Sequence, residues 1–130
     1  MAIARLHHTQ QVHYLRKTVG FGDDGNELVV GTIPSGSLIL KPMSGAHVST
    51  AFNATTTNTL DIGLSANPDD PNLLATILAL GTTTFVPLDE AIGGYLVTHD
   101  VTVTASVILS GVVTAGSAEV VICYIPDNDG

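Results

Sequence analysis

The chain has 130 residues, 45 % of them hydrophobic and 12 % charged, with one cysteine, which predicts one compact domain and excludes a disordered chain or a disulfide-stapled scaffold. Its net charge is −8, and residues 42–130 contain no lysine or arginine, the residues that binding to nucleic acid requires. The longest apolar runs, about half a dozen residues, fall far below the roughly 20 that cross a bilayer, which predicts a soluble protein without membrane span or signal peptide.

The first twenty residues predict an N-terminal arm or an edge strand (1–20), ahead of a single β-sandwich domain over residues 21–130. This segment holds three of the four basic residues of the chain, on an otherwise acidic protein. A basic segment of this kind orients docking onto an acidic surface, whereas the alternative is an ordinary first strand with solvated ends. The basic residues, our candidates for contact with a partner, are Arg5, Arg16, Lys17 and Lys41.

Short apolar segments separated by glycine, asparagine and proline predict a chain that is mostly β-structure. The strands are expected at 10–19, 27–33, 37–41, 46–52, 58–64, 82–88, 95–98, 101–109 and 118–125. Eight or nine short strands at a spacing of roughly ten residues are typical of an all-β fold. We therefore expect a β-sandwich or jelly roll of about eight short antiparallel strands.

One segment departs from this pattern and predicts a short helix near residues 71–80. Asp70 is a suitable N-cap, Pro71 suits the first helical position, and Gly81 follows the last turn. Leu73, Leu74, Ile77 and Leu78 then share one face of the helix. The alternative is another buried strand, because short apolar runs suit both structures.

The last two predicted strands have different patterns. From Val101 to Leu109 apolar residues alternate with hydroxyl-bearing ones such as Thr104, which predicts one buried face and one face in water. From Ala118 to Ile125 both alternate sets are apolar, which predicts a strand covered on both sides. Cys123 lies in the second segment, so we expect its thiol to be buried.

The sequence predicts no catalytic, cofactor-binding or metal-binding residues. The pair His99-Asp100 has no serine in a nucleophile-elbow context to activate, and the cysteine is expected to be buried. The acidic segments 23–27 and 67–70 lack the spacing of an EF-hand loop and are expected to form turns and caps. The histidines lack the ligand spacing of a zinc site, and no Gly-rich phosphate-binding motif is present. We expect a protein that is not an enzyme.

The aromatic residues are few for a sugar-binding site, which usually presents exposed aromatic rings. Phe52, Phe85 and Tyr124 lie in apolar strands and are expected in the core. Only Tyr14, Tyr95 and Phe21 then remain as candidates for a surface site.

Several short segments occur in an order that resembles small structural proteins of tailed bacteriophage virions. The resemblance extends over about residues 32–125. It consists of an I-P-x-G turn, a V-x-T-A-F-N strand, a T-L-D-I-G strand, a short P-D helix entry and a Thr-rich pair of late strands. These segments are Thr32–Ile39, Val48–Asn53, Thr59–Gly63, Asn67–Asp69, Val101–Thr104 and Glu119–Tyr124. Within that group the chain is similar to capsid decoration or cement proteins.

This resemblance implies a non-catalytic structural protein that binds the outer surface of an assembled phage capsid and stabilises it. The implied partners are the major capsid protein of the shell and further copies of the chain, as a homodimer or homotrimer, with no nucleic acid and no membrane. The implied location is the virion, after synthesis in the cytoplasm of the host bacterium. The alternative is a head-fibre or tail-associated module that binds host glycan through loop residues Asp23, Asp24, Asn53, Asn58 and Tyr95.

Overall fold

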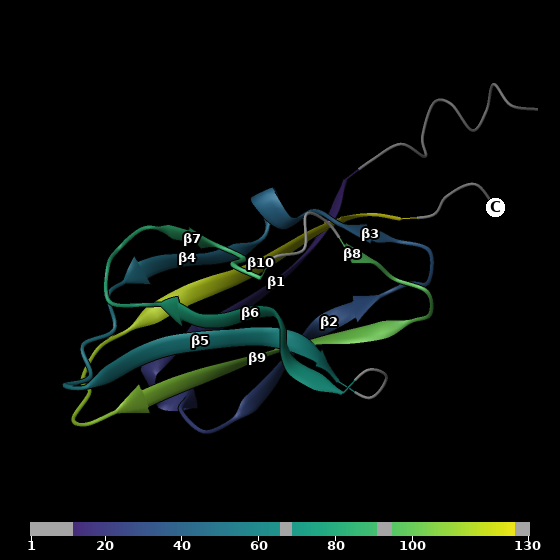
Figure 1. The fold of residues 1–130 in the computed structure, drawn as a ribbon. Helices are drawn as coiled ribbons and strands as arrows, with labels where there is room; N and C mark the ends of the chain where they lie inside the picture. The colour runs from purple at the N-terminus through teal and green to yellow at the C-terminus, as the bar shows by residue number, and fades with distance from the viewer. Residues whose placement is uncertain (1–11, 66–68, 91–94, 127–130) are drawn as a thin grey trace, which may run out of the picture.

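The computed structural model describes residues 12–65, 69–90 and 95–126, which form two antiparallel β-sheets packed face to face (Figure 1). Within these residues the only helical segments are two 3-10 turns, neither of which is long enough to span a membrane. The elements are β1 His13–Gly20, η1 Phe21–Asp23, β2 Glu27–Ile33, β3 Leu38–Ile39, η2 Lys41–Met43, β4 Gly45–Thr50, β5 Thr57–Ser65, β6 Asp70–Ala79, β7 Phe85–Pro87, β8 Tyr95–Leu96, β9 Val101–Ser110 and β10 Ser117–Ile125. The predicted all-β sandwich is confirmed.

The first sheet, here called sheet A, is built around β10. One edge of β10 pairs with β1 along its whole length, from His13 opposite Tyr124 to Gly20 opposite Ser117. The other edge pairs with β4 and β3, and β7 and β8 extend the sheet beyond them. The second sheet, sheet B, has the order β2-β9-β5-β6. The structure thus places residues 13–20 in a strand at the edge of sheet A.

The core lies between the two sheets and is formed by alternate residues of each strand. In β9 the predicted inward set is confirmed, since its five members are all buried, namely Val101, Val103, Ala105, Val107 and Leu109. On the opposite face the prediction for Thr104 is wrong, because this residue is also buried. Thr104 lies opposite Gly63 of β5, and the backbone of Asp70 and Pro71 passes directly over Gly63. That crossing covers the outer side of the sheet at this point.

The predicted coverage of β10 is confirmed on one face and only partly present on the other. Ala118, Val120 and Ile122 are buried on the inward face, where they meet sheet B. On the outward face Val121 is half-buried and Ile125 is exposed. The predicted burial of Cys123, also on the outward face, is confirmed.

The predicted helix at 71–80 is wrong, and the segment is strand β6. Its residues pair with β5, with Leu78 opposite Leu60 and Ala75 opposite Ile62. Pairing with a neighbouring strand outweighs local helix signals, because it satisfies the edge of β5 and buries apolar residues against the core. Asp70 accepts a hydrogen bond from the backbone N–H of Asn72 (3.3 Å), an Asx-type bond rather than a helix cap.

Pro71 and Ile77 lie where β6 departs from regular pairing. The register between β5 and β6 shifts twice, and Pro71 lies in the first irregular stretch, where a missing N–H is tolerated. Ile77 has a φ of 56° and is 65 % exposed, although the helical pattern placed it on the buried face. The N–H groups of Thr76 and Ile77 donate to Asp89 Oδ1 (2.9 Å) and Asp61 Oδ1 (2.8 Å). These two carboxylates hold the strained conformation.

We expect Ile77→Gly to raise the free energy of unfolding by about 1 kcal/mol. A left-handed conformation costs a residue with a Cβ roughly 1–2 kcal/mol, and glycine avoids this cost while losing some backbone entropy on folding. Urea denaturation measures the change. Ile77→Val is the control, because valine retains the branched Cβ and leaves stability within about 0.5 kcal/mol. A stability loss in the glycine variant would contradict the assigned strain.

Candidate interaction surface

The acidic and amide side chains of the loops are occupied in holding the fold. Asp23 accepts a hydrogen bond from the N–H of Gly20 (2.7 Å), and Asp24 accepts one from the N–H of Leu109 (2.9 Å). Asn53 bonds with the backbone of Thr114 (2.9 Å), as expected of side chains that fix loop conformation. Within the described ranges no group of three or more histidine, cysteine or carboxylate side chains is arranged to hold a metal ion.

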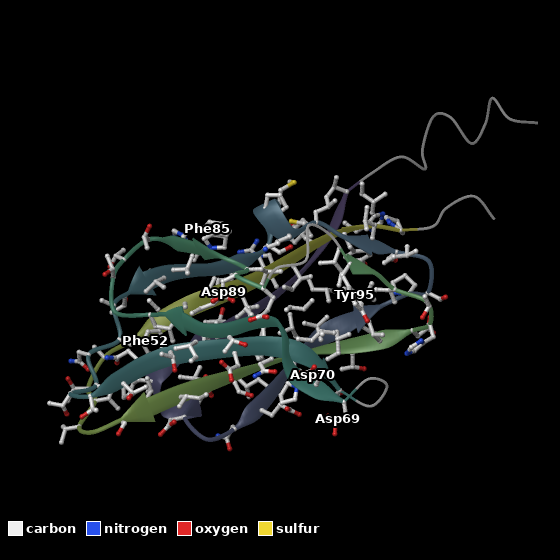
Figure 2. The ribbon with its side chains drawn as sticks, in the orientation of Figure 1. Phe52, Asp69, Asp70, Phe85, Asp89 and Tyr95 are labelled. Carbon is white, nitrogen blue, oxygen red and sulfur yellow. The ribbon has the colours of Figure 1, made fainter. Side chains whose placement is uncertain are left out.

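Asn58 and Tyr95, the other residues of the alternative glycan site, do not form a surface cluster with Asp23, Asp24 and Asn53. Asn58 is half-buried, and both atoms of its amide group bond with the backbone of Ala54 (2.7 and 2.9 Å). Tyr95 is half-buried in β8 and packs against the core. In Figure 2 Tyr95 lies at the end of the sandwich away from Phe52. The structure therefore does not unite Tyr95 with Asn53, which follows Phe52 in the chain.

The outward side of sheet A, here called face A, carries exposed apolar side chains in rows across its strands. One row runs from Leu96 of β8 through Leu38 of β3 to Ile125 of β10. In the row from Phe85 of β7 through His47 to Glu119, only Phe85 is apolar. The exposed large apolar residues of face A are Tyr14, Leu38, Met43, Phe85, Leu96 and Ile125. Apolar side chains exposed together on one face are typical of an interaction surface.

Phe85 corrects a prediction. The apolar pattern placed this ring in the core, but the side chain is 41 % exposed. Figure 2 shows Phe85 on the side of β7 that faces away from sheet B. The strand is only three residues long and lies at the edge of sheet A, where the inward residue is its neighbour Val86, packed against the core. Strand alternation therefore directs Phe85 outward.

The turn η2 lies over face A, and the thiol of Cys123 in β10 donates to the carbonyl of Met43 in this turn (3.5 Å). Figure 1 shows the turn beside β10. Ser44 connects the two elements, because its Oγ donates to the carbonyl of Leu40 (2.7 Å) and accepts from the N–H of Cys123 (2.9 Å). Burial raises the pKa of the Cys123 thiol, so the thiolate is scarce at neutral pH. Cys123 is thus a packed structural residue beneath the turn that carries Lys41 and Met43.

The outward side of sheet B, here called face B, is polar and acidic. Glu27, Ser106 and Asp61 lie in one row across β2, β9 and β5. Threonine and serine occupy most other outward positions of β2, β9 and β5. The exposed large apolar residues in the strands of sheet B are Val29, Ile77 and Ile108. None of the four strands of sheet B contains a lysine or an arginine. The two outer faces of the sandwich therefore differ in both charge and polarity.

The structure brings two of the four predicted contact residues to face A. Arg16 lies there opposite Val121 and forms an ion pair with Glu119 (2.6 Å), and hydrogen bonds with Glu119 and Tyr14 raise the pKa of its guanidinium. Lys41 lies in η2, where its Nζ donates to the carbonyl of Glu90. Lys17 is exposed in β1, but it lies opposite the inward residue Val120 and so projects from the other side of the strand. Arg5 is outside the described residues.

The sequence did not single out the apolar residues of face A. Leu38, Leu96 and Ile125 are separated by up to 87 positions along the chain, from 38 to 125, and only the pairing of β3, β8 and β10 aligns them. The available signal was weak, namely that both alternate sets of 118–125 are apolar. That pattern predicted a second apolar face on β10, which other strands then extend.

Comparison with known proteins identifies a match at the level of fold. No family model matches the chain, and no curated protein sequence does. Among solved structures, a chain of the cyanophage Pam1 capsid asymmetric unit is similar, with a TM-score of 0.68 over 92 % of this chain and 88 % of that chain. The two have the same fold. Their sequence identity is 20 %, so the similarity is one of architecture, and it extends over nearly the whole of both chains.

Proposed function

We propose that this protein is a structural component of a phage virion that binds the outer surface of the assembled capsid and stabilises the shell. The observation that carries the proposal is the shared fold with a chain of a phage capsid asymmetric unit over 92 % of this chain. The major capsid protein is then the partner, and the protein acts as a decoration or cement protein without catalysis. This proposal accords with the independent resemblance of its sequence motifs to phage structural proteins.

The described structure supports this function physically. A two-layer sandwich with a continuous buried core is rigid, so little conformational entropy is lost when it docks. A protein that binds only the assembled shell stabilises that state by mass action, and many copies add their contributions. The sandwich also has strand edges to cover, which favours association of copies as a homodimer or homotrimer on the shell.

The glycan-binding alternative receives less support from the geometry. Asp24, Asn53 and Asn58 use side-chain atoms to bind backbone groups of the fold, those of Leu109, Thr114 and Ala54 respectively. A sugar site needs such groups directed toward solvent, next to an exposed aromatic ring. We therefore retain capsid decoration as the proposal.

The number of copies per virion tests the proposed function. In purified virions of the phage that encodes this chain, quantitative mass spectrometry is expected to find on the order of one copy per major capsid subunit. Mild chaotrope treatment is expected to release the protein and lower the temperature at which the shells open, because bound copies stabilise the assembled state. A handful of copies would instead indicate a tail or vertex component, and absence from the particle would overturn the proposal.

A further inference from the structure

We infer that face A is the surface that docks onto the capsid shell, with face B turned toward solvent. This inference rests on the proposed function and specifies the orientation of the sandwich and the chemistry of its partner. The partner surface presents apolar side chains to the rows of face A and carboxylates to Arg16 and Lys41.

The apolar content of face A is the first argument. Its exposed apolar residues include the aromatic rings of Tyr14 and Phe85 and the flexible side chain of Met43. Aromatic residues and methionine are enriched in the central parts of protein interfaces. Strand pairing holds Leu38, Leu96 and their neighbours in fixed positions, so burying them costs little ordering entropy. Hydroxyl and carboxylate groups dominate face B, and their burial would require matched partners.

Charge gives the second argument and defines the partner. Among the described residues, the cations Arg16 and Lys41 lie on face A, where Arg16 pairs with Glu119 and Lys41 donates to the carbonyl of Glu90. The strands of sheet B instead carry Glu27 and the half-buried Asp61, with no cation. Glu119 occupies only part of the Arg16 guanidinium, which has five N–H donors, so further donors remain for a second carboxylate. A carboxylate-bearing shell surface complements Arg16 and Lys41, whereas a second copy meeting face A through the same face would bring the same two cations with it.

Matched substitutions on the two faces test the docking orientation. Leu96 on face A and Val29 on face B are equally exposed, at 60 % and 58 %. Purified variants are mixed with shells from which the native protein has been removed, and binding is measured by co-sedimentation. Leu96→Glu is expected to lower the affinity at least about tenfold, because it places a charge in the apolar row that Leu96 forms with Leu38 and Ile125. Val29→Glu is expected to bind as the wild-type protein does, and both variants are checked for folding by urea denaturation.

A second pair of variants tests the charge argument on a single strand. Arg16 and Lys17 are adjacent and exposed in β1 but project from opposite sides of it. Arg16→Gln is expected to weaken shell binding and to reduce its salt dependence, because a carboxylate contact on face A is lost. Lys17→Gln is expected to change neither. Equal effects of the two substitutions would overturn the assignment of the carboxylate contact to face A.

The outcomes separate this inference from the proposed function. Failure of the wild-type protein to bind stripped shells would overturn the proposed function. Binding by the wild type that is lost in Val29→Glu but retained in Leu96→Glu would assign docking to face B and overturn only the orientation. Leu96→Glu could instead convert an oligomer to monomers that still bind shells as tightly as the wild type. That result would show that face A joins copies of the chain, and it would also overturn the inference.

Discussion

A Gly63→Ala variant is expected to lose at least about 3 kcal/mol of unfolding free energy, at the upper end of overpacking effects. A Cβ added to Gly63 would lie 2.1 Å from the carbonyl oxygen of Asp70 and 2.3 Å from the carbonyl carbon of Pro71. Both atoms belong to the backbone, so no side-chain rotation relieves the clash. The first residues of β6 would have to move away from β5, which would also uncover Thr104 on face B.

Gly81→Ala is the matched control for this prediction. Gly81 follows β6, and a Cβ added there meets nothing within 4 Å. The same substitution is therefore expected to be neutral or to stabilise by up to about 1 kcal/mol, since alanine restricts the unfolded chain. Urea denaturation of both variants measures the difference. A loss below about 1 kcal/mol in Gly63→Ala would contradict the close crossing of β6 over β5.

Ile62→Ala is expected to cost about 4 kcal/mol, toward the upper end of the range for large-to-small core substitutions. Ile62 is fully buried in β5, and its neighbours on the adjacent strands are Ala105 of β9 and Ala75 of β6. Two alanines cannot extend into the space left by the missing side chain, so the cavity stays open and the lost contacts are not replaced.

The control for Ile62→Ala is the same substitution at Ile108, which is exposed on face B in the neighbouring strand β9. Ile108→Ala removes the same atoms without creating a buried cavity, so its cost is expected to be about 1 kcal/mol or less. Thermal or urea denaturation of the two variants measures the contrast. Equal losses would show that Ile62 is not in a tightly packed core.

The bounds of four of the longer strands were predictable because they depend on the local pattern of apolar and turn-forming residues. The expected strand at 27–33 has the bounds of β2. The strands expected at 101–109 and 118–125 differ from β9 and β10 by one residue at one end, and the strand expected at 58–64 differs from β5 by one residue at each end. Less regular segments were predicted less well. The segment 37–41 forms only the two residues of β3 before η2 begins at Lys41, and 82–88 is reduced to the three residues of β7.

The helix predicted at 71–80 shows where local signals fail. Capping by Asp70, a proline in the first turn and the spacing of apolar residues all favoured a helix, and each is an interaction within a few residues. Strand β6 forms because β5 presents an unpaired edge and a core into which Leu74 and Leu78 fit. That preference arises from contacts with a distant partner and has no signature in the segment itself.

The cations of the candidate interaction surface were predicted from the sequence, but its apolar residues were not. The scarcity of cations and their concentration before residue 42 identified Arg16 and Lys41 from composition alone. The sequence grouped Lys17 with them. In the structure, the alternation of side chains along β1 directs Lys17 away from face A. The exposed apolar row on which the docking inference rests could not be predicted from the sequence, because Leu38, Leu96 and Ile125 lie in three separate segments of the chain.

The sequence by itself determined an all-β domain, the inward residues of its long strands and an acidic body with few cations, because alternation and composition are properties of the local chain. Only the tertiary structure decided that 70–79 is a strand, that Phe85 points outward and that two faces of opposite character exist. These features depend on which strands pair and in which register, and pairing free energy is gained between residues far apart in the chain.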